Sequence, residues 1–142
     1  MATQVLSSMI RINRQRRLAL RRSLTPYRYV GCMHLIVLYT NRHPGASQEE
    51  IASFYALDKG SVARDARRLE DMGHIRRETV PNNRRQYQLF LTEEGERMLP
   101  VLDQAFEEFQ ARLSASLSPE DWQLLTDLLE RLEQGSFPHT AS

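Results

Sequence analysis

The sequence predicts a mainly α-helical fold that carries one small β-hairpin, an α+β protein. Two short helical patterns, separated by a tight turn, occupy Ser47 to Gly73. Two strand-like runs follow at once, residues 76–80 and 86–91, with Pro and Asn between them. Amphipathic helical patterns lie on both sides of this block. At 142 residues the chain fits one domain, residues 1–142, with a modest core.

The two short helices carry recognisable start and stop signals. Ser47 is an N-cap that forms a capping box with Glu50, and Asp58 is the N-cap of the second helix. Gly73 stands where helices commonly end in a left-handed residue. The second helix combines an apolar stripe with a polar face: Val62, Ala66 and Leu69 against Lys59, Ser61, Arg64, Asp65, Arg68 and Asp71. These residues fit a helix-turn-helix and equally an ordinary αα-hairpin with a solvated charged face.

The hairpin that follows favours the helix-turn-helix. Residues 86–91 alternate with a period close to two, as a half-buried strand does. Turn chemistry over residues 81–85 places Arg84 and Arg85 at the hairpin tip, where they suit a DNA groove or a phosphate better than a core. A helix-turn-helix followed by a hairpin is a winged helix, so residues 47–91 are predicted to form a DNA-binding lobe.

The flanking segments predict four further helices. They are Gln4–Leu20, a second from the N-cap Thr25 and Pro26 to Asn41, a long third capped by Thr92 and running to Ser116, and a last from the N-cap Ser118 that Gly135 and Pro138 end. The apolar seams of the terminal helices exceed what one thin domain covers. Residues 1–42 and 92–135 are therefore predicted to form the dimerisation lobe of a homodimer, with an intramolecular helical bundle as the alternative. Residues 136–142 are expected to be a flexible tail.

Charge is strongly segregated along the chain although its net value is only +1. Residues 1–30 hold seven arginines and no acid, whereas residues 86–142 hold eleven acids and three arginines. A local basic face of this kind supplies the counterion release that drives binding to nucleic acid. The longest apolar run, residues 35–39, is far too short for a membrane span. With one cysteine and no signal-peptide pattern, the expected compartment is the cytoplasm.

Three short motifs occur in a fixed order: Leu69–Gly73 at the end of the basic helix, Asn83-Arg84-Arg85 in the wing, and Leu91-Thr92-Glu93-Glu94-Gly95 opening the next helix. This ordered set resembles the MarR family of bacterial winged-helix regulators. Asn83 replaces the aspartate of the family's Asp-x-Arg wing motif, which looks like a brace for the wing arginine. The resemblance implies a homodimeric, sequence-specific transcriptional regulator, expected to repress from a pseudo-palindromic operator on the bacterial nucleoid.

The resemblance also implies which residues meet DNA. The helix over residues 59–72 would enter a major groove, with Ser61, Arg64 and Arg68 at or near the bases. Gln48, Lys59 and Arg84 are expected at phosphates, and Arg85 in the flanking minor groove. Asp65 is expected to orient Arg64 or Arg68, because phosphates repel a bare carboxylate.

The family's usual effector is a small aromatic or phenolic molecule, for which Tyr27, Tyr29, Met33 and His34 are the candidate lining. His34 is interpreted as a packed core histidine rather than a metal ligand, and Cys32 as a small buried hydrophobe rather than an oxidant sensor. The sequence holds no catalytic constellation, and no cofactor or metal is expected. A winged helix that docks an acidic protein partner, with no DNA role, is the alternative function.

Overall fold

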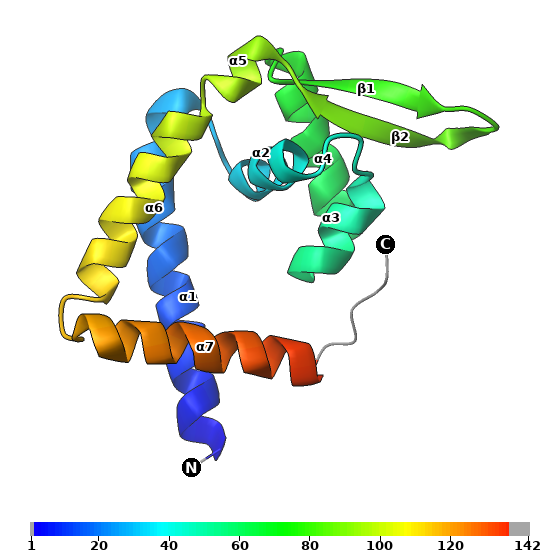
Figure 1. Cartoon of the computed structure of the whole chain (residues 1–142). Coiled ribbons are helices and arrows are strands. Elements are labelled where there is room, and N and C mark those ends of the chain that lie inside the picture. The colour runs from blue at the N-terminus through cyan, green and yellow to red at the C-terminus, as the bar shows by residue number, and fades with distance from the viewer. Residues whose placement is uncertain (1, 137–142) are drawn as a thin grey trace. The chain divides into compact units, whose positions relative to one another are not determined.

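The computed structural model describes residues 2–136, without the side chains of Ala2 and Arg84. The elements, in chain order, are α1 (Ala2–Leu24), η1 (Thr25–Tyr27), α2 (Met33–Arg42), α3 (Gln48–Tyr55), α4 (Lys59–Asp71), β1 (Ile75–Val80), β2 (Asn83–Leu91), α5 (Glu93–Glu96), α6 (Leu99–Leu113) and α7 (Pro119–Ser136) (Figure 1). The predicted fold class, mainly helical with one antiparallel hairpin, is confirmed. Of the predicted tail only Ser136 is described, and residues 137–142 lie outside the described part of the chain.

The chain divides into two compact units, residues 1–106 and 107–142. In the first unit α2 is central to the core, and its Met33, Ile36 and Val37 are fully buried. Side chains from α1, α3, α4, both strands and the start of α6 complete this core: Leu20, Leu24, Ile51, Val62, Leu69, Ile75, Leu89 and Leu102. The second unit contains α7, which has no buried residue. No described helix combines the length and the hydropathy needed to cross a membrane.

The predicted caps of the helix-turn-helix are confirmed. Ser47 Oγ accepts the backbone N–H of Glu50, and Asp58 Oδ2 accepts that of Ser61. Gly73 has the predicted left-handed backbone, with φ of 79°. The turn between α3 and α4 holds a further left-handed residue, Ala56, whose N–H bonds back to α3.

The predicted second helix is wrong over nearly its first half. Thr25 does not cap it, because the Thr25 hydroxyl donates instead to the carbonyl of Arg21 at the end of α1. The chain then turns through two left-handed residues, Arg28 and Gly31, and α2 begins only at Met33. Cys32, predicted inside the helix, is its N-cap. Burial of Leu24 and of Tyr29 explains the turn, since a continuous helix would not direct both side chains into the core.

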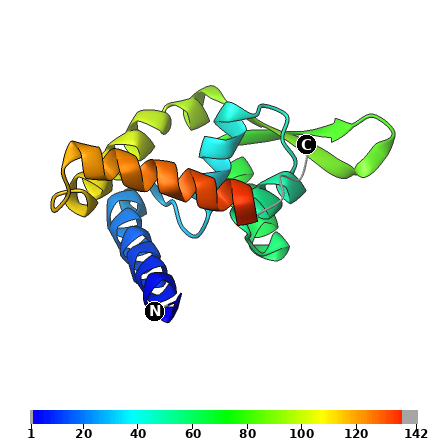
Figure 2. The same cartoon turned by 60° about the horizontal axis from the view of Figure 1, so that its bottom comes forward.

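The hairpin differs from the prediction near its tip. The turn consists of Pro81 and Asn82 alone, and β2 begins at Asn83, so Arg84 and Arg85 lie in the strand rather than in the turn. Val80 pairs with Asn83 whereas Thr79 pairs with Tyr87, which leaves residues 84–86 as a bulge. In Figure 2 the hairpin extends away from α3 and α4.

The long helix predicted from Thr92 to Ser116 is broken into α5 and α6. Thr92 caps α5 as predicted, accepting the N–H of Gly95. The break at residues 97–98 comes just before Pro100, which has no N–H to donate to the carbonyl of Glu96 and so cannot continue a helix from α5. Ser118 caps α7 as predicted, but Gly135 does not end that helix, which continues to Ser136.

Candidate nucleic-acid interface

Helix α4 is held firmly by the core of the first unit. Its apolar stripe, Val62, Ala66 and Leu69, is fully buried against neighbouring elements. Burying a large aliphatic side chain of this kind stabilises a fold by about 1.5–3 kcal/mol. The stripe therefore fixes which face of α4 the protein presents to solvent.

The exposed face of α4 is basic. Arg64 and Arg68, both predicted base contacts, are exposed, and Lys59 is exposed at the first position of the helix. Ser61, half-buried, donates through its hydroxyl to Asp58 Oδ2 and accepts from Arg64 Nη2 at 3.2 Å. The backbone N–H of Ser61, which also donates to Asp58 Oδ2, and then the Ser61 hydroxyl lower the pKa of Asp58.

Sequence reasoning missed Arg67, which is also exposed on α4. It follows Arg64 by three residues and therefore lies on the same face of the helix. Counting helical periodicity from Arg64 is enough to find it.

Asp65 was predicted on the exposed face and is in fact buried. Its Oδ1 pairs with Arg68 Nη1 at 3.0 Å, so the predicted role in orienting an arginine of α4 has a geometric basis. Its Oδ2 accepts the backbone N–H of Cys32 at 2.9 Å and the Cys32 thiol at 3.1 Å. The two hydrogen bonds between Asp65 and Cys32 could not be predicted from the sequence.

The wing is anchored at its base and basic along its length. Leu89 exchanges backbone hydrogen bonds with residues 45 and 46, which ties β2 to the segment before α3. The guanidinium of Arg76 lies 4.7 Å from the ring centroid of Phe90, a cation–π contact, and its Nη2 pairs with Glu78 Oε1 at 3.2 Å. Arg85 is exposed, and Asn83 Oδ1 accepts its backbone N–H at 3.2 Å.

Asn83 thus holds the backbone of the wing at the bulge. Arg84 lies on β2, and its side chain falls outside the described part of the chain. Gln48, the remaining predicted phosphate contact, begins α3 with a half-buried side chain. Its Nε2 is buried without a hydrogen-bond partner among the described residues.

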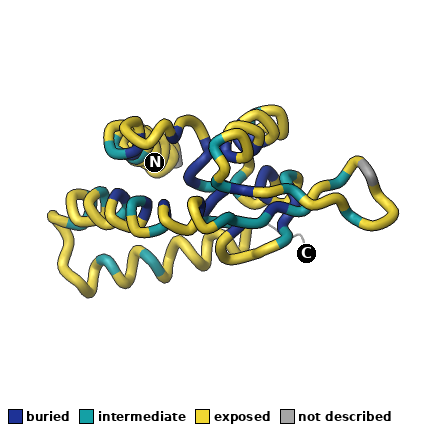
Figure 3. Tube along the Cα trace, turned by 90° about the horizontal axis from the view of Figure 1, so that it is seen from above, coloured by how far each residue is buried: buried dark blue, intermediate teal, exposed yellow. Residues whose placement is uncertain are grey.

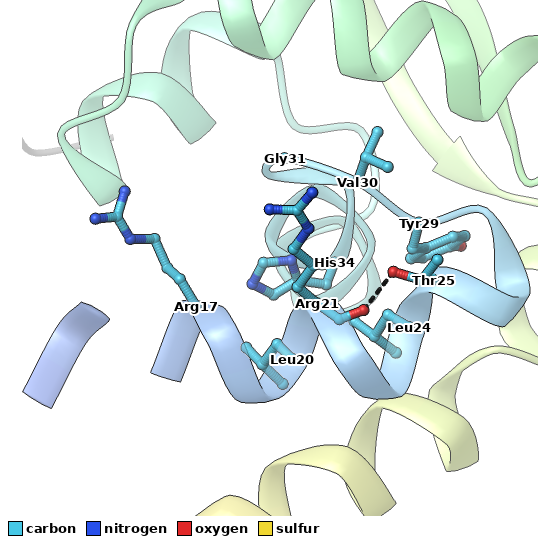
Figure 4. A pocket seen from close by; sticks show the side chains of 9 residues that line it. All are labelled: Arg17, Leu20, Arg21, Leu24, Thr25, Tyr29, Val30, Gly31 and His34. Carbon is cyan, nitrogen blue, oxygen red and sulfur yellow. Dashed lines mark hydrogen bonds between the residues drawn. The ribbon is translucent and has the colours of Figure 1, made fainter. Parts of the chain in front are cut away.

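A pocket of about 430 Å³ lies beside the start of α2, between α1 and the segment that follows it (Figure 4). Its lining is Arg17, Leu20, Arg21, Leu24, Thr25, Tyr29, Val30, Gly31 and His34. Of the predicted effector-binding residues, Tyr29 and His34 line this pocket. Met33 does not, because it is fully buried in the core, and Tyr27 points to solvent instead.

The two predicted residues that line the pocket are uncharged. Burial lowers the pKa of His34 to about 4, so its imidazole is neutral and accepts from Arg16 Nη1 at 3.3 Å. Burial raises the pKa of Tyr29, whose hydroxyl lies 2.7 Å from His74 Nδ1 just beyond α4. The arginines therefore supply the charge of the pocket.

Cys32 is buried, as predicted, and its thiol has a raised pKa. Burial, and to a smaller extent the hydrogen bond to Asp65, raises the pKa of this thiol to about 12. The thiolate, which is the nucleophilic form, is thus essentially unpopulated at neutral pH. Among the described residues, no group of three His, Cys, Asp or Glu side chains could hold a metal ion.

Comparison with known proteins agrees with this geometry. The sequence model of the MarR family matches residues 34–87. The HTH-type transcriptional regulator BilQ of Clostridium symbiosum (strain WAL-14163) is 31% identical over 103 residues, which are 72% of this chain and 72% of that protein. A crystal structure of MarR matches with a TM-score of 0.82 and 32% identity, covering 95% of this chain and 97% of that one.

A MarR transcriptional regulator from Methanosarcina mazei Go1 shows the same fold, with a TM-score of 0.85 at 24% identity over 94% of this chain and 96% of that one. The relatives are transcriptional regulators, and the helix-turn-helix, wing and capped α5 found here lie in the order that the family motifs predict. The chain belongs to the MarR family of DNA-binding transcriptional regulators.

Proposed function

We propose that the protein is a homodimeric repressor in which each subunit places α4 in a major groove and its wing in the flanking minor groove. The observation that supports this most is the basic row of α4. Arg64, Arg67 and Arg68 are exposed on a helix whose opposite stripe is fully buried. Arginine on such a helix is suited to bidentate contact with guanine, and a rigid backbone holds it in register.

The wing supports a second, less specific contact. Arg85 is exposed on the bulge of β2, and Arg76 is exposed beside Phe90, where it also pairs with Glu78. The minor groove carries little sequence information but attracts arginine where it is narrow. The wing is therefore proposed to add affinity on A·T-rich flanks rather than base preference.

Large apolar side chains left exposed on the terminal helices support the dimer. On α1 they are Val5, Leu6, Met9, Ile10, Ile12 and Leu18, and on α7 they are Leu124, Leu125, Leu128, Leu129 and Leu132. In Figure 3 the tube of α7 is exposed or intermediate throughout. Apolar surface of this extent on a monomer marks an interaction site, and a two-fold partner would cover it.

The deciding experiment is selection of bound duplexes from a random pool. A homodimer is expected to enrich a pseudo-palindrome with half-sites about 10 base pairs apart. Arg64→Ala should relax the preference at one position of each half-site, at a cost of about 1–3 kcal/mol on the best site. If the protein enriches no sequence, and binds no duplex even at low salt, the proposal fails and a winged helix that docks an acidic protein is favoured.

The pocket is proposed to bind the effector that releases DNA. Arg17 and Arg21 add two cations to the apolar Leu20 and Leu24, a combination that suits a small aromatic carboxylate. Benzoate is a suitable probe: it should weaken binding to the selected duplex, and Arg21→Ala should abolish that effect. The effector proposal would fall, while the DNA proposal would stand, if DNA binding ignored such anions at every concentration tried.

A further inference from the structure

The carboxylate of Asp65 serves two elements at once. Its Oδ1 holds Arg68 on the exposed side of α4, and its Oδ2 accepts two hydrogen bonds from Cys32 at the start of α2. Asp65 is only 5% exposed although it belongs to the helix that faces DNA. A buried carboxylate is stable only when its oxygens are paired, and here both of them are.

The two partners restrain each other through Asp65. Cys32 is the N-cap of α2, and its backbone N–H donates to Asp65. If Asp65 moved away, this N–H would be left buried without an acceptor, which is costly. The Asp65 carboxylate is therefore fixed in place by Cys32. Arg68 Nη1, which donates to the other oxygen of this carboxylate, is fixed with it. The rest of the Arg68 side chain is exposed, and its remaining guanidinium N–H groups stay available to a base edge.

A close backbone approach restricts Asp65 further. Gly31, which has a left-handed backbone, lies so near that a Cβ at this position would overlap Asp65 Oδ2. Gly31 also lines the pocket. The carboxylate is thus confined between Gly31, Cys32 and Arg68.

We propose that Asp65 is a specificity-determining positioning residue that orients the Arg68 guanidinium for base readout and ties its position to the start of α2. The inference rests on the proposed function, because it assumes that α4 reads DNA. An arginine whose guanidinium is held at one nitrogen discriminates between bases better than a free one, since fewer orientations of the guanidinium satisfy its hydrogen bonds.

The test uses Asp65→Asn in the full-length protein. The amide oxygen can still accept from Cys32, but the amide offers Arg68 no charge. Arg68→Ala first identifies, by repeated duplex selection, the base pair that Arg68 reads. The ratio of affinities for the selected duplex and for one altered at that base pair is then measured by fluorescence anisotropy. We expect Asp65→Asn to lower this ratio about tenfold, toward that of Arg68→Ala.

Three controls separate positioning from charge and from folding. Asp71→Asn removes the same charge from an exposed position on α4, and should change both affinities by one factor and leave their ratio intact. In the Arg68→Ala background, Asp65→Asn should not change the ratio further, because the residue through which Asp65 acts is gone. Arg68→Lys alters an exposed side chain, so it keeps the fold, and loss of the fork should lower the ratio as well.

Three results would overturn the inference: an unchanged ratio in Asp65→Asn, a further fall of the ratio in the double variant, or a full ratio in Arg68→Lys. Each leaves the proposed function intact, because the parent protein still selects a duplex. If the parent selects none, the proposed function and this inference fall together. Gly31→Ala gives an independent check from outside α4, since its Cβ should displace Asp65 and lower the ratio at the same base pair.

Discussion

Acidification should destabilise this protein through His34. The imidazole is only 8% exposed, and its Nε2 accepts a hydrogen bond from Arg16, which requires the neutral form. Burial is the main cause that lowers its pKa from 6.5 to about 4, and the nearby Arg16 charge lowers it further. The folded protein thus resists a proton that the unfolded chain accepts readily.

The sign and the size follow from that difference in pKa. Because the unfolded chain binds the proton first as pH falls, the stabilisation is complete above pH 6.5 and is lost progressively toward pH 4. The full effect is about 3 kcal/mol at 1.36 kcal/mol for each unit of pKa. At about pH 5, roughly 2 kcal/mol of it should already be gone.

Urea unfolding at about pH 7.5 and about pH 5 measures this loss. His34→Gln, which cannot take up a proton, should lose roughly 2 kcal/mol less than the parent over the same interval. His74, whose pKa burial also lowers, contributes equally to both proteins and cancels from the comparison. Both proteins must be compared at one concentration, since the proposed dimer would make the stability depend on protein concentration. Equal losses in the two proteins would refute the assignment of a neutral, buried His34.

Three further outcomes are expected. Replacing Leu128 and Leu132, both exposed on α7, by Glu should convert a dimer into a folded monomer in sedimentation; a monomeric parent protein would contradict the proposed dimer. Cys32→Ser should leave DNA binding and its response to peroxide unchanged, because the thiol has a pKa of about 12; protection of DNA binding by the Ser variant would show instead that Cys32 senses oxidant. Arg85→Ala should weaken binding to a selected and a scrambled duplex alike and lower the salt slope by about one charge, as anisotropy across a salt series measures; no change on either duplex would mean that the wing does not touch DNA.

The sequence by itself determined the elements whose signals are local. Ser47, Asp58, Thr92 and Ser118 each cap a helix by accepting an N–H three residues later. Such bonds close within one turn, so a pattern of neighbouring residues is enough to predict them. The apolar stripe of α4 could equally be predicted from the sequence, because helical periodicity fixes which residues share a face. The fold class and the family motifs depended on signals of this kind.

The tertiary structure alone decided what happens between Leu24 and Met33. Thr25 and Pro26 are good helix starters, but the chain turns there since Leu24 and Tyr29 both enter the core. That turn creates one wall of the pocket, and it explains why Tyr29 lines the pocket whereas Tyr27 faces solvent. Burial of a side chain depends on elements distant in sequence, which no local pattern encodes.

Asp65 shows the same limit most clearly. From its neighbours in sequence it belongs to a polar helix face, and its bond to Arg68, three residues away, follows from helical spacing. Its burial does not, because the donors that make a buried carboxylate stable come from Cys32, far away in the chain. A charged residue next to a helix's apolar stripe is exposed unless another element brings it partners, and only the packed structure supplies them.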